Sequence, residues 1–104
     1  MRSFKIFCGT DTNGNDVNAT AYAHNLAAKY FPHGHTVYNA TGRWMEEVGV
    51  IDEPTIVVEV ITEDTGSDAE RIRQAVQSFA GDYKFFCYQE SVMITCTPIE
   101  AWFV

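Results

Sequence analysis

Residues 55–62, TIVVEVIT, constrain the fold of this chain more than any other segment. The stretch is rich in β-branched side chains, which favour an extended strand. Its apolar side chains alternate onto both sides of the predicted strand, Ile56, Val58 and Val60 on one side and Val57 and Ile61 on the other. Such a strand is expected in a sheet that is covered on both faces.

The segments before this strand predict two further strands and a helix. SFKIFC (3–8) alternates between apolar and polar residues, which predicts a first strand, and TVYNA (36–40) predicts a second. Between them, VNATAYAHNLAAKYF (17–31) carries apolar residues at helical spacing. Asn15 or Asp16 is suited to cap the start of this predicted helix.

A second helix and a last strand are predicted after residue 62. A capping box begins at Ser67, and Gly81 is a natural C-terminal cap for the helix that follows it. KFFCYQESVMITC (84–96) then predicts a long fourth strand with apolar residues on both sides.

The predicted order is β-α-β-β-α-β, which is the ferredoxin-like arrangement. We therefore predict an α+β fold in which two helices cover one face of a four-stranded antiparallel sheet, with residues 1–104 forming a single domain. The other face would be wet in a monomer, although its strands are apolar there too. Because the sequence offers no spare helix, we expect a homo-oligomer in which another copy covers that face. The apolar segment PIEAWFV is a candidate for crossing to the neighbour.

The charge of the chain restricts its partners. A formal net charge of −7 argues against nucleic acids and anionic membranes, which attract surfaces rich in Lys and Arg. No apolar run approaches the ~20 residues of a membrane helix, and the start of the chain resembles a strand rather than a signal peptide. The 3 cysteines include Cys87 and Cys96, which share one predicted strand and lie too far apart there to bridge. Reduced thiols and a cytoplasmic location are expected.

We expect neither a metal nor a cofactor. His33-Gly34-His35 has the appearance of a ligand pair, but two imidazoles need a third ligand, and no spaced Cys or Glu partner is present. The flanking Pro32 and the central glycine predict a tight turn instead.

Polar residues inside the predicted fourth strand are the first candidates for a site. Tyr88-Gln89-Glu90-Ser91 interrupts a run that otherwise has the character of a buried strand. A glutamine in such a strand needs hydrogen-bond partners, which neighbouring backbone, a ligand or water at the sheet edge would supply. The turn GTDTNG after the first strand is a candidate rim, with Thr10 and Asp11 as its polar residues.

Residues 39–55, NATGRWMEEVGVIDEPT, are predicted to be a long connection between two strands. Trp44 in this segment is either a lid over the core or the wall of a binding site. Glu53 is either a solvated turn residue or a carboxylate held in place by Pro54, which restricts the backbone where the next strand begins.

Three short segments resemble the phage-encoded S-adenosylmethionine lyases: Thr41-Gly42-Arg43-Trp44, then Glu53 before the β-branched strand, then Tyr88 and Gln89. The cellular lyases that degrade the S-adenosylmethionine–AMP conjugate, a second messenger of type III CRISPR systems, are similar in the same way. The resemblance covers about residues 36–96 and implies a PII-like trimer with active sites between subunits. FPHGHTVYNATGRW and the later Glu-Pro and Gln-Glu-Ser-Val segments also resemble a bacterial domain family of unknown function.

The lyase resemblance implies a reaction that needs orientation rather than acid catalysis. The carboxylate of the substrate attacks its own γ-carbon, expelling methylthioadenosine (or its adenylated form) and forming homoserine lactone. Glu53 and Gln89 are the implied catalytic residues, with Glu53 on the α-ammonium or the sulfonium and Gln89 on the methionyl part.

The remaining residues of the resemblance have implied roles in substrate binding. Trp44 would stack on adenine or lie against the sulfonium, and Tyr88 would help to fix the methionyl part. Arg43 is either a phosphate ligand, if the substrate carries AMP, or an ordinary exposed charge.

Three classes of function are therefore considered. The first is a lyase for S-adenosylmethionine or its AMP conjugate, a small-molecule substrate, working as a homotrimer without a cofactor. The second is a module of the same fold that binds or sequesters a nucleotide-like ligand without turnover. In the third, Trp44 and the C-terminal segment serve only assembly.

Overall fold

The computed structural model describes all 104 residues and has the predicted order of elements. The bounds are β1 (Arg2–Gly9), α1 (Ala19–Tyr30), β2 (Thr36–Glu46), β3 (Gly49–Thr62), α2 (Ser67–Phe86) and β4 (Met93–Pro98). The strands form one antiparallel sheet in the order β2-β3-β1-β4, which confirms the ferredoxin-like fold.

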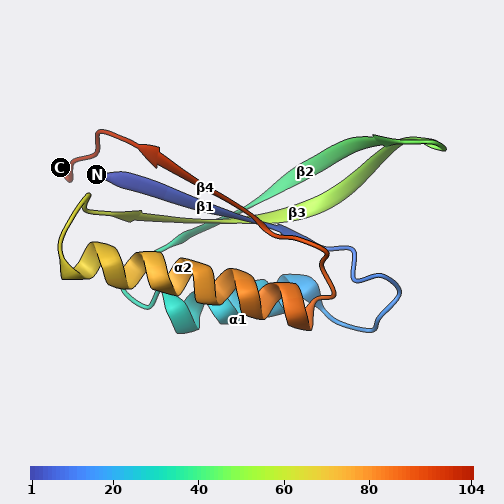
Figure 1. Ribbon diagram of the computed structural model, residues 1–104, viewed down its shortest axis with the longest axis horizontal. Helices are drawn as coiled ribbons and strands as arrows, with labels where there is room; N and C mark the ends of the chain where they lie inside the picture. Colours follow the sequence, from blue (N-terminus) through green and yellow to red (C-terminus); the bar gives the residue numbers. More distant parts are fainter.

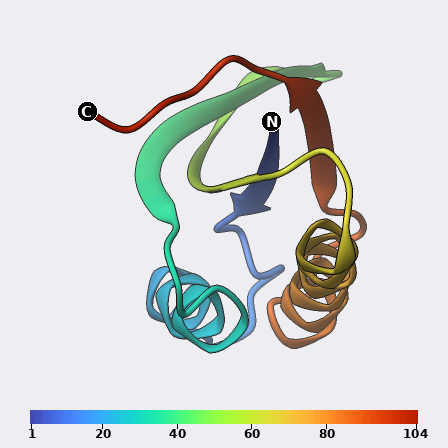
Figure 2. The ribbon, with the colours of Figure 1, turned by 90° about the vertical axis from the view of Figure 1, so that its left-hand side faces the viewer.

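Both helices cover the same face of the sheet, as Figure 2 shows. The core lies between the helices and this face. Phe4, Ile6 and Cys8 of β1 face the helices, and each is paired across the sheet with a residue of the β-branched run in β3. Phe79 and Tyr83 are the largest side chains that α2 buries against this face. We call the uncovered side the open face. On it Val57 is buried, whereas Tyr38, Ile61 and Met93 are exposed.

The segment 39–55 is not a connection, and this part of the prediction was wrong. It forms most of a long β2–β3 hairpin whose turn is Glu47 and Val48, and the hairpin projects beyond the rest of the sheet in Figure 1. Strand pairing continues to Glu46 and Gly49, so backbone hydrogen bonds hold the two strands together although few of their side chains are buried here. The molecule is therefore elongated, at 46 × 24 × 22 Å.

The helix ends also differ from the prediction. The first helix is capped by Asn18, whose side chain accepts a hydrogen bond from the Ala21 N–H at 3.0 Å, rather than by Asn15 or Asp16. At the second helix Gly66 holds the N-cap position, and Ser67 makes no side-chain capping bond. Neither helix combines the length and the apolar character that crossing a bilayer demands.

The second helix continues past Gly81, which was predicted to end it, because the next turn buries Tyr83 completely. Phe85 and Phe86 consequently belong to α2 and not to the last strand, which begins only at Met93. The polar residues around Gln89 are thus a connection between helix and strand. Cys87 is the C-cap residue of α2 and is buried, and Cys96 is exposed on β4, so these two cysteines do not share a strand.

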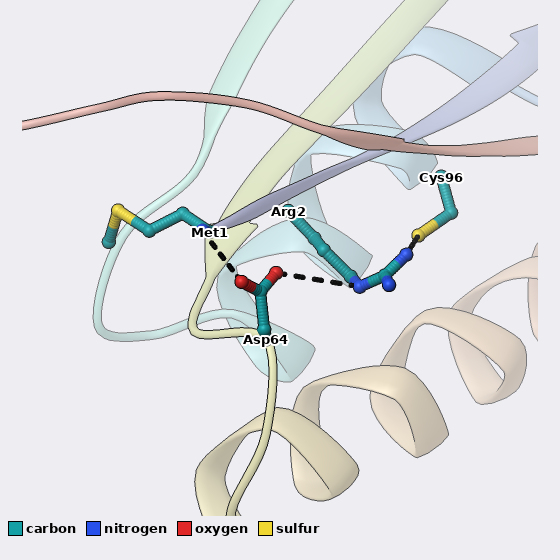
Figure 3. A network of polar contacts seen from close by, with 4 residues as sticks. All are labelled: Met1, Arg2, Asp64 and Cys96. Atoms are coloured by element: carbon teal, nitrogen blue, oxygen red, sulfur yellow. Dashed lines mark hydrogen bonds and ion pairs between the residues drawn. The ribbon is translucent and has the colours of Figure 1, made fainter.

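Polar contacts tie the start of β1 to its surroundings (Figure 3). The Asp64 carboxylate lies 3.1 Å from the nitrogen of Met1 and 3.5 Å from Nε of Arg2. A nitrogen of Arg2 also lies 3.7 Å from the sulfur of Cys96 on β4. These exposed contacts contribute little energy individually, but they join the end of β3 and β4 to β1.

Candidate functional site

An open cleft of about 370 Å³ lies where β1 ends, alongside the β2–β3 hairpin and the connection that follows α2. Its polar and aromatic lining comes from all three places: Asp11, Trp44, Glu46, Glu53, Gln89 and Glu90. We call this the β1-end cleft. It brings together four of the site residues predicted from separate parts of the sequence, namely Asp11, Trp44, Glu53 and Gln89.

Gly9, the last residue of β1, provides the space in which the two polar side chains meet. A Cβ on Gly9 would lie 2.7 Å from Oε1 of Glu53 and 2.9 Å from Oε1 of Gln89. Both distances are shorter than ordinary contacts, so a larger residue here would displace one or both oxygens. The carboxylate and the amide oxygen therefore converge over a bare stretch of backbone.

The Glu53 carboxylate is held by hydrogen bonding to the segment after β1. Its Oε2 accepts a hydrogen bond from the Asp11 N–H at 2.6 Å. Thr10 fastens this segment to β3, because both its N–H and its hydroxyl donate to the Pro54 carbonyl, at 3.2 and 2.5 Å. One oxygen of Glu53 is thus fixed by backbone, and the other points towards Gly9.

The Gln89 side chain is oriented by two carbonyl groups. Its Nε2 donates to the Asp11 carbonyl at 2.6 Å and to the Cys87 carbonyl at 3.0 Å, which leaves its oxygen to face Gly9. The backbone around it is strained, because Tyr88 and Asn13 both have a positive φ, 56° and 55°. Asn13 holds this pair together by donating from Nδ2 to the Tyr88 carbonyl at 2.6 Å.

Trp44 forms the aromatic wall of the cleft and is 40% exposed. It shares one face of the hairpin with Glu46 and with Gly42, which pairs with Glu53. Its indole N–H donates to Oε1 of Glu46 at 3.0 Å. This bond restrains the ring, while a large part of the indole stays available to a ligand.

Three of the nominated residues do not line the cleft. Arg43 alternates onto the opposite side of the hairpin and forms two hydrogen bonds with Asp52, at 2.6 and 3.2 Å, which raise the pKa of its guanidinium. The Thr10 hydroxyl is already bonded to Pro54. Tyr88 lines a neighbouring, largely apolar hollow of about 770 Å³ with Phe85 and Phe86, which meets the cleft at Gln89.

The sequence matches one protein family over residues 4–103, under the description "Protein of unknown function (DUF3574)". The chain belongs to this DUF3574 family. The match confirms the resemblance to a domain family of unknown function. No curated protein matches this DUF3574 chain.

Two solved structures show the same fold as this DUF3574 chain. A phage SAM lyase in complex with S-methyl-5′-thioadenosine has a TM-score of 0.67 and 17% sequence identity, covering 92% of this chain and 79% of the other. A phage SAM lyase in the apo state has a TM-score of 0.68 and 16% identity, covering 92% and 78%. At this identity the likeness establishes the shared fold.

Buried groups support the floor of the cleft in this DUF3574 chain. The Tyr83 hydroxyl donates to the Gly9 carbonyl at 2.5 Å. Burial, followed by the neighbouring Cys8 and Cys87, raises the Tyr83 pKa far above its usual range, so the hydroxyl remains a donor. Burial also raises the Cys8 pKa to about 12, and this thiol is not a nucleophile.

Sequence reasoning missed Glu46, and it included Gly9, Asn13 and Glu90 only as members of the predicted rim GTDTNG and of the polar segment 88–91, not as individual site residues. Glu46 follows Trp44 at a spacing of two, which would have placed both on one face had the segment been assigned as a strand. Gly9 carried no comparable signal, because its importance depends on two side chains that are distant in the sequence.

Proposed function

We propose that this protein is a lyase that cleaves S-adenosylmethionine or its AMP conjugate in the β1-end cleft. The observation that carries the proposal is the convergence of the Glu53 and Gln89 oxygens over Gly9, beside the exposed face of Trp44. Two acceptors and an aromatic ring suit a ligand that bears an ammonium, a sulfonium and a purine. The fold shared with the phage SAM lyases supports the same reaction class.

The reaction balances without any group from the protein. A bond forms between a carboxylate oxygen of the substrate and its γ-carbon, while the bond from that carbon to the sulfonium sulfur breaks. The bonding electrons pass to sulfur, which leaves as the neutral thioether of methylthioadenosine, and the methionyl part closes to homoserine lactone. No proton needs to move, so the protein contributes orientation.

The cleft residues have separate tasks in this mechanism. Glu53 and Gln89 accept hydrogen bonds from the α-ammonium through the oxygens that face Gly9, which folds the methionyl chain for in-line attack. Trp44 lies against the adenine or the sulfonium, a cation–π contact of about 1–2 kcal/mol when desolvated. Asp11 holds both acceptors in place through its N–H and its carbonyl.

The active unit is proposed to be a homotrimer. Tyr38, Ile61 and Met93 leave apolar surface on the open face, which a further subunit would cover. Trp102 and Phe103 are also exposed. They belong to the segment after β4, which runs on the side of the sheet away from the helices in Figure 2. A monomer in light scattering at micromolar concentration would contradict this assembly.

A binding module without turnover is the second candidate. The observation that favours it is that Glu53 and Gln89 are already held by backbone hydrogen bonds, so the cleft is preformed. A preformed site of this kind retains a ligand as readily as it converts one.

The decisive experiment is an incubation of the protein with S-adenosylmethionine and, separately, with its AMP conjugate. Chromatography should show methylthioadenosine or its adenylated form. Glu53→Gln should reduce turnover by about 100-fold or more, because without the carboxylate charge the α-ammonium is held less firmly, and a misplacement of the methionyl part by ~1 Å loses rate on that scale. Glu47→Gln, which removes one charge at the hairpin turn, should retain full turnover. Absence of product from both substrates, with binding intact, would favour the second candidate.

A further inference from the structure

The β1-end cleft carries an unusual concentration of negative charge. Four carboxylates line it, those of Asp11, Glu46, Glu53 and Glu90. The rest of the lining consists of amides, one indole and one hydroxyl, with no lysine, arginine or histidine among them. The molecule as a whole has a formal charge of −7, so its long-range field also attracts cations and repels anions.

The basic residue adjacent to Trp44 in the sequence does not offset this charge. Arg43 points to the other side of the hairpin and is occupied by Asp52 at 2.6 and 3.2 Å. A phosphate in the cleft would therefore meet carboxylates without a cation, and like charges placed together are unfavourable.

We propose that the cleft selects ligands with a net positive charge and rejects phosphorylated nucleosides, and that Glu46 and Glu90 determine this specificity. The inference rests on the proposed function and identifies S-adenosylmethionine, rather than its AMP conjugate, as the substrate. A sulfonium and an ammonium outweigh the single carboxylate of S-adenosylmethionine by one positive charge, and an added phosphate cancels that excess.

Glu46 and Glu90 are separate from the pair that holds the methionyl part. Glu53 and Gln89 face Gly9, whereas Glu46 lies along the hairpin beside the indole and Glu90 belongs to the connection after α2. Replacing Glu46 by glutamine keeps an oxygen that can accept the indole N–H bond, so the substitution changes charge more than geometry. Both side chains belong to exposed residues, so each charge is expected to change the preference for a cationic ligand by about threefold at low salt.

The test measures binding of ligands that the reaction cannot consume. Sinefungin carries a protonated amine in place of the sulfonium, and S-adenosylhomocysteine is the uncharged thioether of similar shape. Calorimetry on the wild-type protein should give tighter binding of sinefungin than of S-adenosylhomocysteine, and of adenosine than of AMP, by about tenfold in each comparison at low salt. Both preferences should diminish as salt is raised.

The variant Glu46→Gln/Glu90→Gln should reduce both preferences to about twofold or less, and the control Glu47→Gln should leave them unchanged. AMP binding as tightly as adenosine in the wild type, or preferences that survive the double substitution, would overturn the proposal. Cation preference without turnover would sink the lyase function and leave this inference standing. Turnover of the AMP conjugate at the rate of S-adenosylmethionine would sink only this inference.

Discussion

Substituting Gly9 by alanine should separate the function of the β1-end cleft from the stability of the fold. The added Cβ would lie 2.7 Å from Oε1 of Glu53 and 2.9 Å from Oε1 of Gln89, so both oxygens must retreat by several tenths of an ångström. A misplacement of ~1 Å can cost about 100-fold in rate, and we expect Gly9→Ala to lose about tenfold or more in turnover.

The fold should tolerate the same change. The φ of Gly9 is not positive, so alanine fits the backbone, and the displaced atoms are ends of flexible side chains. Alanine also lowers the entropy of the unfolded chain by an equivalent of about 0.4–1 kcal/mol, which offsets part of the clash. The net change in unfolding free energy is expected to stay within about 1 kcal/mol, or ~4–8 °C in Tm for a domain of this size.

Chromatographic turnover and thermal melting would be measured on the same preparations. Gly81→Ala is the matched control, because its Cβ would meet no atom within 4 Å and it lies inside α2. It should keep full turnover and gain about 0.5–1 kcal/mol of stability. Full turnover in Gly9→Ala would refute the assignment of the converging oxygens, and a Tm loss well beyond ~8 °C would refute the argument from flexible side-chain ends.

Two further predictions concern buried and strained residues. The Cys8 pKa is raised from 9.0 to about 12 by burial and then by Cys87, so the unfolded chain ionises first. The contribution of this thiol to the unfolding free energy is fully present below pH 9 and should fall by up to ~1.4 kcal/mol per pH unit towards pH 12. Denaturant titrations at several pH values should show that the unfolding free energy of Cys8→Ala falls less steeply with pH. An equally steep fall would contradict the reasoning. Tyr88 has a φ of 56°, so Tyr88→Gly should melt no lower than the wild type and gain up to ~1 kcal/mol, whereas a lower Tm would show that its contacts outweigh the strain.

The order of elements was predictable because most of the sheet obeys its periodicity. The run at 55–62 alternates as expected, and Ile56, Val58 and Val60 do face the helices. The hairpin was missed for the opposite reason. Residues 43–50 leave neither side of the ribbon buried, so no apolar alternation marks them as strands.

The ends of α2 show how tertiary packing overrides local signals. Gly81 is a normal cap residue, but burying Tyr83 against β1 favours another turn of helix. Phe85 and Phe86 favour strands by propensity, yet they continue that helix with exposed rings.

The candidate site was predictable only in part. Glu53 and Gln89 were conspicuous as polar residues beside restricted or apolar segments, and the structure brings them together. Glu46 and Gly9 depend on the strand register and on a close approach between distant segments, neither of which a single sequence contains.

The two-stranded geometry of the hairpin determines which length changes relatives of this protein can tolerate. Residues added to the turn at Glu47 and Val48 extend the arm without altering the pairing of Gly42 with Glu53. One residue inserted between Glu53 and Pro54 would instead occupy the place opposite Gly42 and move Glu53 opposite Arg43, on the other side of the ribbon. Related chains should therefore vary freely in arm length, while the number of residues between Glu53 and the core strand remains fixed.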